Sequence, residues 1–316
     1  MKKFCTDIYT RDELDLLSCC TLCPRECRVN RFEGGNGYCG IDAGMNIASI
    51  CIHRGEEPQV SGPDGICNIF FAGCNLRCIY CQNHDISRPD GEYIKSSVSF
   101  ESALDQIEKI LATGIKAVGF VSPSHVVPQV KAIIRGLYAR GLKPITVYNT
   151  NSYDKPEVIE SLEGLIDVYL PDYKYITPGI SNDFSDADDY PEVALAAIKK
   201  MYFQKGSRLH LDKDGRAENG MLIRHLVLPG NVEESKKILK SIAEELSTGV
   251  HLSLMSQYHP TPLVKSHNVL NRALYKAEYE SVVEAMENLD FRNGWVQDMD
   301  SFMNYRPDFR KENPFE

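Results

Sequence analysis

Short apolar segments alternate with amphipathic segments along most of the chain. Six apolar, β-branched runs have the length of buried strands and span residues 66–73, 117–123, 145–151, 166–175, 220–230 and 249–258. Amphipathic segments lie between them at 99–114, 191–203 and 232–246. In the first of these, Leu104, Ile107, Ile110 and Leu111 share one helical face. Strands that alternate with helices predict a parallel sheet with right-handed crossovers. Six units predict an α/β fold, a partial (β/α)6 barrel, with a doubly wound sheet as the alternative.

The pattern also divides the chain into three parts. Residues 1–64 are rich in cysteine, glycine and proline and show little periodicity, which predicts a cysteine-rich N-terminal module. Residues 65–262 carry the predicted barrel, and residues 263–316 are expected to form a C-terminal helical extension. In parallel α/β folds the chemistry lies at the carboxyl ends of the strands. The segments that follow the strands are therefore the first place to look for functional residues.

Composition narrows the class of protein. The chain is 43% hydrophobic and 25% charged, which is ordinary for a globular protein. No run of 18 apolar residues occurs, and the basic N-terminus lacks the apolar stretch of a signal peptide. We therefore expect a cytoplasmic protein without a membrane partner. A net charge of -9 argues against a nucleic-acid-binding surface, which needs a basic face.

Three cysteines follow the first predicted strand in the stretch FAGCNLRCIYCQN. Cys74, Cys78 and Cys81 have the spacing Cys-x3-Cys-x2-Cys, with no fourth cysteine or histidine completing a set. Without a secretory signal these thiols should be reduced, and clustered reduced cysteines indicate metal binding or catalysis. A structural zinc site needs four closed ligands. Three thiolates can instead hold a cubane iron–sulfur cluster and leave its fourth iron open to a small molecule.

This motif, with an aromatic residue before its last cysteine, resembles the signature of radical S-adenosylmethionine enzymes. Within that superfamily the chain is most similar to the pyruvate formate-lyase activating enzyme-like group. The resemblance implies a partial or full β/α barrel, a [4Fe–4S] cluster and S-adenosylmethionine. It further implies one-electron cleavage of the cofactor to methionine and a 5′-deoxyadenosyl radical, which abstracts a hydrogen atom from the substrate. A reductant such as flavodoxin or ferredoxin is the implied electron donor.

The resemblance extends to residues at the predicted strand ends. Tyr80 is implied to lie near the adenine, with loop packing as the alternative, and Asn83 is a candidate cofactor contact. The segment VSPSH offers Ser122, Ser124 and His125 in place of the family's Gly-Gly-Glu-Pro. Helix capping is an alternative role for Ser124. The run Asn149, Thr150, Asn151 is similar to the family's Asp-Thr-Asn-Gly and is implied to contact the cofactor or a cation, a simple turn being the alternative.

Charged residues in two further strands have similar counterparts. Asp172 and Lys174 alternate in strand register and therefore face the same side. Lys174 is implied to pair with the carboxylate of S-adenosylmethionine and Asp172 to orient it or bind a cation, an ion pair between the two being the alternative. Arg224 lies in an apolar strand, where an unpaired charge is costly, so it is expected to serve a carboxylate of S-adenosylmethionine or of the substrate in the barrel. Gln257, Tyr258 and His259 follow the last strand and are candidates, together with His125, for the substrate pocket.

A second group of cysteines precedes the barrel. Cys20, Cys23, Cys27 and Cys39 predict a closed metal site, which thiolates alone do not assign to zinc or to an auxiliary iron–sulfur cluster. Reduced cysteines without metal are the alternative, and Cys19 is an alternative first ligand. The stretch HRGEEP at 53–58 is interpreted as a charged linker, with a position at the barrel mouth as the alternative for its side chains.

Three functions are consistent with these residues. The first is an activase that abstracts a hydrogen atom from a glycine of a partner protein. The second is a radical enzyme that acts on a small molecule, a peptide or another protein site. The third, a non-catalytic metal-binding scaffold, is disfavoured because an open iron beside polar strand ends is typical of catalysis.

Overall fold

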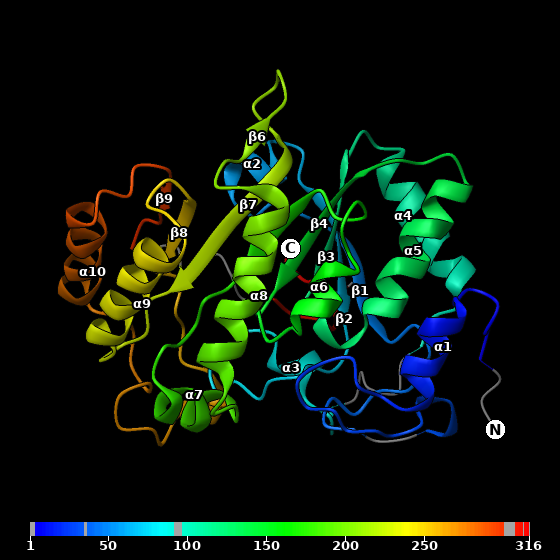
Figure 1. Ribbon diagram of the computed structural model, residues 1–316, viewed down its shortest axis with the longest axis horizontal. Helices are drawn as coiled ribbons and strands as arrows, with labels where there is room; N and C mark the ends of the chain where they lie inside the picture. The colour runs from blue at the N-terminus through cyan, green and yellow to red at the C-terminus, as the bar shows by residue number, and fades with distance from the viewer. Residues whose placement is uncertain (1–3, 35–36, 92–96, 300–306, 312, 316) are drawn as a thin grey trace.

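The computed structural model of the protein describes residues 4–34, 37–91, 97–299, 307–311 and 313–315, and its centre is one twisted sheet (Figure 1). In chain order the strands are β1 (Ile47–His53), β2 (Ile66–Phe71), β3 (Ala117–Val121), β4 (Ile145–Thr150), β5 (Val168–Pro171), β6 (His210–Leu211), β7 (Ala217–Leu226), β8 (His251–Met255) and β9 (Gly294–Val296). Their order in space is β1-β2-β3-β4-β5-β7-β8-β9, and β6 pairs with β7 outside this path.

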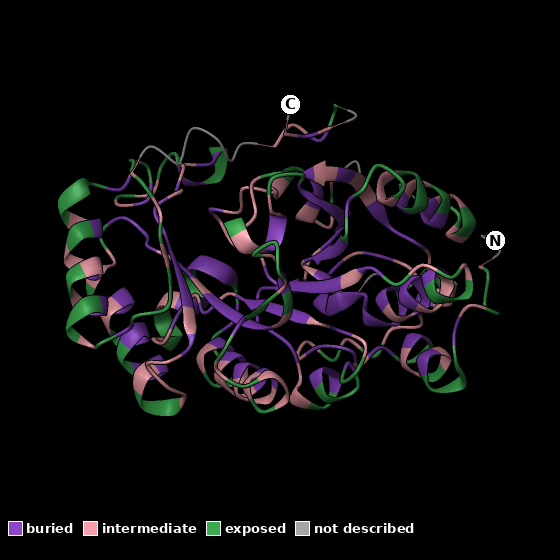
Figure 2. Ribbon diagram, turned by 90° about the horizontal axis from the view of Figure 1, so that it is seen from above, coloured by how far each residue is buried: buried purple, intermediate pink, exposed green. Residues whose placement is uncertain are grey.

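Helices connect these strands and cover the outside of the sheet, with their exposed faces turned away from it (Figure 2). The α-helices are α1 (Arg11–Ser18), α2 (Pro58–Ser61), α3 (His84–Ser87), α4 (Phe100–Leu111), α5 (Val127–Ala139), α6 (Pro156–Glu160), α7 (Pro178–Ser185), α8 (Tyr190–Lys205), α9 (Val232–Glu245) and α10 (Lys276–Asn288). Short 3₁₀ turns are η1 (Arg31–Glu33), η3 (Pro123–His125) and η4 (Pro262–Val264). Within the described ranges, no helix has the length and apolar character needed to cross a membrane.

The predicted α/β architecture is confirmed. All six predicted strands are present as β2, β3, β4, β5, β7 and β8, and each pairs in parallel with the next. The predicted helix at 99–114 is α4, whose Leu104 and Ile107 are buried and whose Ser99 hydroxyl caps the first turn. Strands β2 and β3 are buried along their whole length, as parallel strands covered by helices must be. The sheet is compatible with the partial barrel that the strand count predicted.

Both edges of the sheet come from segments outside residues 65–262. Strand β1 pairs antiparallel with β2, with His53 opposite Ile66, although the N-terminal sequence shows little periodicity. Strand β9 pairs in parallel with β8 and places Trp295 beside Ser253. The C-terminal extension therefore holds a strand as well as helix α10. The division of the chain at residues 64 and 262 stays a prediction about folding units.

Candidate active site

The cysteine loop begins at the carboxyl end of β2 and faces a cavity of about 780 Å³. Gly73 has a φ of +76°, and a Cβ there would lie 2.5 Å from the carbonyl oxygen of Cys39. Only glycine fits this close approach. The chain then turns so that Cys74, Cys78 and Cys81 all line the cavity. The strand and the tight turn after it thus direct three sulfur atoms toward one space.

Each sulfur of the loop already accepts a hydrogen bond. Asn151 Nδ2 lies 3.5 Å from Cys74 Sγ, Ser185 Oγ lies 3.0 Å from Cys78 Sγ, and Ser87 Oγ lies 3.6 Å from Cys81 Sγ. Burial raises the pKa of the Cys74 thiol to about 12 and also raises the pKa of Cys78. These thiols are therefore neutral until a metal supplies positive charge. Donors of this kind stabilise thiolate ligands of iron–sulfur clusters, so the loop fits a cluster held by three cysteines.

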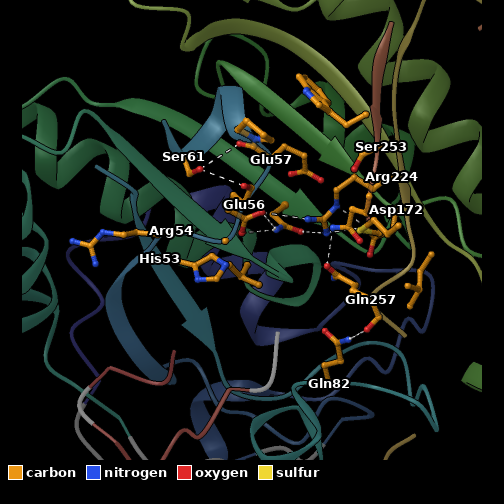
Figure 3. A pocket seen from close by; sticks show the side chains of 18 of the residues that line it. His53, Arg54, Glu56, Glu57, Ser61, Gln82, Asp172, Arg224, Ser253 and Gln257 are labelled. Carbon is orange, nitrogen blue, oxygen red and sulfur yellow. Dashed lines mark hydrogen bonds and ion pairs between the residues drawn. The ribbon is translucent and has the colours of Figure 1, made fainter. Parts of the chain in front are cut away.

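A row of charged side chains extends across the cavity, beginning beside the cluster loop. Lys174 Nζ lies 2.6 Å from Asp172 Oδ2, Arg224 Nε donates to Asp172 Oδ1 at 2.8 Å, and Arg224 Nη1 lies 3.4 Å from Glu56 Oε2. Arg224 also donates to Asn149 Oδ1 at 2.6 Å. Burial would raise the pKa of Asp172, but Arg224 and Lys174 outweigh burial and hold it below its usual range. Arg224 is thus paired within the chain with Asp172 and Glu56, whereas the carboxylate expected for it was one of the cofactor or the substrate (Figure 3).

The structure brings most of the predicted site residues to this cavity. Besides the three cysteines, its lining contains Tyr80, Asn83, Ser122, Asn149, Asn151, Asp172, Lys174, Arg224 and Gln257. Tyr80 is buried, and its hydroxyl lies 2.5 Å from the hydroxyl of Tyr175. Gln257 is held from both sides, because its carbonyl oxygen accepts from Gln82 and its amide oxygen from Gln297. The carboxyl ends of β2, β3, β4 and β7 therefore converge as a parallel sheet requires.

Other predicted residues are buried behind the cavity wall. Ser124 Oγ lies 3.0 Å from Thr150 Oγ1, and Thr150 donates to Asp154 at 2.5 Å. His125 is fully buried with Nε2 2.9 Å from the carbonyl oxygen of Ala72, and burial lowers its pKa to about 4. These contacts fix the strand ends from behind.

The residues after β8 also include one that lines the cavity and others that do not. The Tyr258 hydroxyl donates to the carbonyl oxygen of Leu270 and the side chain is buried, whereas His259 is half-buried. Of the three consecutive candidates, Gln257 is the one that lines the cavity.

Two acidic residues of the cavity were expected at the barrel mouth only as the less favoured alternative. Glu56 and Glu57 belong to the stretch interpreted as a charged linker, yet both are close to buried and line the cavity. Glu56 accepts from Asn68 at 2.9 Å and Asn149 at 3.2 Å, so it joins β2, β4 and β7. The linker interpretation is wrong for these two side chains. The available signal was the preceding segment Ile47–His53, whose apolar residues form a strand that carries the pair to the sheet.

The second cysteine group surrounds a buried arginine. Cys20, Cys23 and Cys39 are buried, and Arg31, itself 2% exposed, donates to Cys39 Sγ at 3.5 Å. Arg31 also donates to the carbonyl oxygen of His125 at 2.8 Å. Burial would lower the pKa of Arg31, but the neighbouring Cys39 and Cys20 outweigh burial and raise it. Cys27 Sγ accepts from the backbone of Tyr38 at 3.2 Å. The four predicted cysteines thus belong to one cluster of contacts around Arg31 and Tyr38, although in the described chain no three His, Cys, Asp or Glu side chains are spaced to hold a single metal ion.

The N-terminal segment also packs directly on the cluster loop. Arg25 Nε donates to the carbonyl oxygen of Asn75 at 3.0 Å, and its guanidinium lies 3.8 Å from the ring centroid of Tyr38. Arg77 of the loop packs on the same ring at 4.4 Å. Together with the approach of Cys39 to Gly73, these contacts make the two cysteine groups neighbours.

Comparisons with known proteins identify the family. The model of the radical SAM superfamily matches residues 68–242. An uncharacterized protein of Methanocaldococcus jannaschii is 31% identical over 277 residues, which cover 86% of this chain and 75% of that protein.

Solved structures give more distant similarities. Streptococcus suis SuiB bound to the precursor peptide SuiA is 12% identical with a TM-score of 0.49, and the match covers 74% of this chain but 48% of that one. The protein anSMEcpe with bound AdoMet is 13% identical with a TM-score of 0.48, covering 76% of this chain and 62% of that one. A domain of pyruvate-formate lyase-activating enzyme from Bacteroides vulgatus is 13% identical with a TM-score of 0.39, covering 54% of this chain and 93% of that one. This chain therefore spans about half the length of SuiB.

Proposed function

The chain belongs to the radical SAM superfamily, and from that premise we propose that it is a radical enzyme whose cluster is held by Cys74, Cys78 and Cys81. The observation that carries the proposal is that all three sulfur atoms, each with a hydrogen-bond donor, line the same cavity as the polar strand ends. When bound, the cluster supplies the electron that cleaves S-adenosylmethionine into methionine and the 5′-deoxyadenosyl radical that takes the substrate's hydrogen atom. A protein reductant such as flavodoxin or ferredoxin is the proposed electron donor.

The residues of the cavity have proposed roles in binding the cofactor. Asp172 shares its negative charge between Lys174 and Arg224. Lys174 can therefore also pair with the carboxylate of S-adenosylmethionine. Tyr80 and Asn83 flank the cofactor from the cluster loop, and Ser122, Asn149 and Asn151 offer hydrogen bonds from the ends of β3 and β4. Ser124, Thr150, His125 and Tyr258 are proposed to act indirectly by fixing the backbone of the wall. Gln257 lies on the substrate side of the cavity.

The cavity favours a substrate with its own polar group. Beyond the cluster loop, the lining continues to Glu56, Glu57, Arg54 and Ser253, which are charged or polar. A glycine residue of a partner protein has no side chain to meet such groups. We therefore favour modification of a small molecule or a peptide side chain over the glycyl-radical activase that the family resemblance also allows.

A second metal at Cys20, Cys23, Cys27 and Cys39 is part of the proposal. A buried guanidinium is costly unless a negative group faces it. Arg31 is in contact with Cys39, and thiolates bound to zinc or to an iron–sulfur cluster would supply that negative charge. Metal binding would draw the four sulfur atoms together around the metal, next to the Arg31 guanidinium. Elemental analysis of purified protein and its Cys23→Ala variant tests for this metal.

The experiment that tests the function is anaerobic reconstitution with iron and sulfide, followed by dithionite and S-adenosylmethionine. Formation of 5′-deoxyadenosine is the expected result, and its absence contradicts the proposal. Substrate class is then read from deuterium transfer into 5′-deoxyadenosine. Transfer from a labelled small-molecule or peptide pool supports the favoured class. Transfer from the α-carbon of a glycine in a partner protein supports the activase instead.

A further inference from the structure

The cavity has a second end, away from the cluster loop. Strand β1 runs antiparallel to β2, so its last residue, His53, lies opposite Ile66 at the start of β2. The cluster loop follows the other end of β2. Residues 53–58 and Ser61 nevertheless line the cavity, and Figure 3 shows Glu56 and Glu57 turned inward toward Arg224 and Ser253, while Arg54 points away. This segment forms the floor of the space whose opposite end carries the three cysteines.

Glu57 on this floor has an unsatisfied oxygen. The residue is 9% exposed and stands at the N-cap position of α2 without making a side-chain capping bond. Ser253 and the residue's own backbone N–H lie near the carboxyl group. The carboxyl oxygen Oε2 is nevertheless buried and has no hydrogen-bond partner. Buried polar atoms in folded proteins nearly always have a partner, and an unpaired one costs about 1–3 kcal/mol. His53 Nδ1 is likewise buried without a partner on the same floor.

The charges around Glu57 leave it without a cation of its own. Arg224 and Lys174 are positive, and they are matched by Asp172 and Glu56 through the ion pairs of the cavity row. Glu57 is a third carboxyl group beside Arg224, which already pairs with the other two. Burial raises its pKa, Glu56 adds to that rise, and Arg224 counteracts it. Burial also lowers the pKa of His53, so this imidazole is neutral and brings no positive charge.

We propose that the floor of the cavity binds an organic ammonium group of the substrate, with Glu57 Oε2 as its hydrogen-bond acceptor and counter-charge. An ammonium group supplies both things that Glu57 lacks, a donor for Oε2 and one positive charge. The remainder of the lining includes the apolar side chains of Phe70, Leu226, Met255, Trp295 and Phe315. The substrate is accordingly an amine with an apolar body that extends toward the cluster loop. That this amine is a substrate rests on the proposed function.

The test is a comparison of three probes of the same shape and different charge. Binding of n-butylammonium, 1-butanol and butyrate to the cluster-reconstituted chain, without S-adenosylmethionine, is followed by ligand-observed NMR. The ammonium ion is expected to bind at least about tenfold more tightly than either other probe, a difference of roughly 1.4 kcal/mol. Since Glu57 must lose its proton to pair with the ammonium ion, affinity should rise with pH, by up to about tenfold per unit below its pKa.

Variants separate Glu57 from the rest of the surface. Glu57→Gln should remove both the preference for n-butylammonium and the pH dependence, and Glu57→Asp should restore part of each. Glu233→Gln, on the exposed face of α9, is the matched control and should bind as the wild type does. Equal binding of the three probes, a preference for butyrate, or an unchanged Glu57→Gln variant overturns the inference.

The outcome is independent of the test for the function. If n-butylammonium binds through Glu57 but no 5′-deoxyadenosine is formed, the amine site stands and the radical function fails. If 5′-deoxyadenosine is formed but the ammonium ion shows no preference, the function stands and the amine site fails.

Discussion

The two cysteine groups of this protein are neighbours in space but lie in opposite surroundings. Cys74, Cys78 and Cys81 line a cavity, and Lys174 nearby is paired with a carboxylate, Asp172. The N-terminal cysteines are packed around Arg31, whose side chain contacts sulfur and a backbone carbonyl oxygen. Open access distinguishes a site that can turn over a substrate from one that can only hold a metal. The same residue type therefore serves chemistry in one place and, by our proposal, structure in the other.

The largest expected difference between the groups is in activity. Replacing Cys78 with alanine removes one of three cluster ligands and should lower 5′-deoxyadenosine formation by at least about 100-fold. Cys23→Ala should lose the second metal but keep cofactor cleavage, because its sulfur is outside the cavity lining. The rate of 5′-deoxyadenosine release and the metal content of each variant measure this. Cys67→Ala, a buried thiol of β2 before the loop, is the control. Equal loss of activity in Cys23→Ala would mean that the two groups act as one centre.

The next largest effect concerns the charges of the cavity. Asp172→Asn leaves Arg224 and Lys174 buried with one carboxylate fewer, and breaking a buried ion pair by removing one partner costs about 3–5 kcal/mol. We expect this loss in the free energy of unfolding measured with urea. Asp105→Asn, which removes an exposed partner of Arg140, should cost no more than about 1 kcal/mol. If Asp172→Asn lowers the free energy of unfolding by less than Asp105→Asn does, the buried row of charges does not stabilise the fold.

Replacing Arg31 tests the state of the N-terminal cysteines, because the change in the free energy of unfolding depends on whether they are thiolates or neutral thiols. If the cysteines are metal-bound thiolates, Arg31→Met removes a hydrogen bond to a charged sulfur and should lower the free energy of unfolding by about 2 kcal/mol. If they are neutral thiols, removal of a buried charge offsets the lost bond to the carbonyl oxygen of His125, and the change should be close to neutral. Urea unfolding, with and without prior removal of metal by a chelator, distinguishes these outcomes. The destabilisation should disappear in the metal-free protein.

The smallest predicted effect is on the redox potential of the cluster. Ser185→Ala removes the 3.0 Å hydrogen bond to Cys78 Sγ, which favours the more negative, reduced cluster. The potential should fall by about 40 mV, the one-electron equivalent of roughly 1 kcal/mol. Spectroscopic redox titration measures this shift. Ser181→Ala in the same helix, whose hydroxyl bonds to the carbonyl oxygen of Pro178, should leave the potential unchanged.

Sequence patterns were most informative where one residue type is needed at fixed spacing. The six buried strands have local signatures, and the three cysteines follow the first of them at a spacing specific to one kind of cluster. The strand-end residues Asn149, Asn151, Asp172 and Arg224 were also identifiable, because parallel strands bring their carboxyl ends together. Thr150 shows the limit of that rule. It stands between the cavity residues Asn149 and Asn151 in sequence, but neighbouring residues of a strand face opposite sides.

The sequence by itself determined the fold class and the superfamily and predicted the three ligands of the cluster, since periodicity and ligand spacing are local properties of the chain. Only the tertiary structure decided which charges meet. Glu56 and Glu57 read as a polar linker until β1 pairs antiparallel with β2 and carries them into the barrel, more than a hundred and fifty positions from Arg224 in the chain. The burial of Arg31 among cysteines was equally hidden, because whether a charge is buried depends on contacts between distant segments and on no pattern within one.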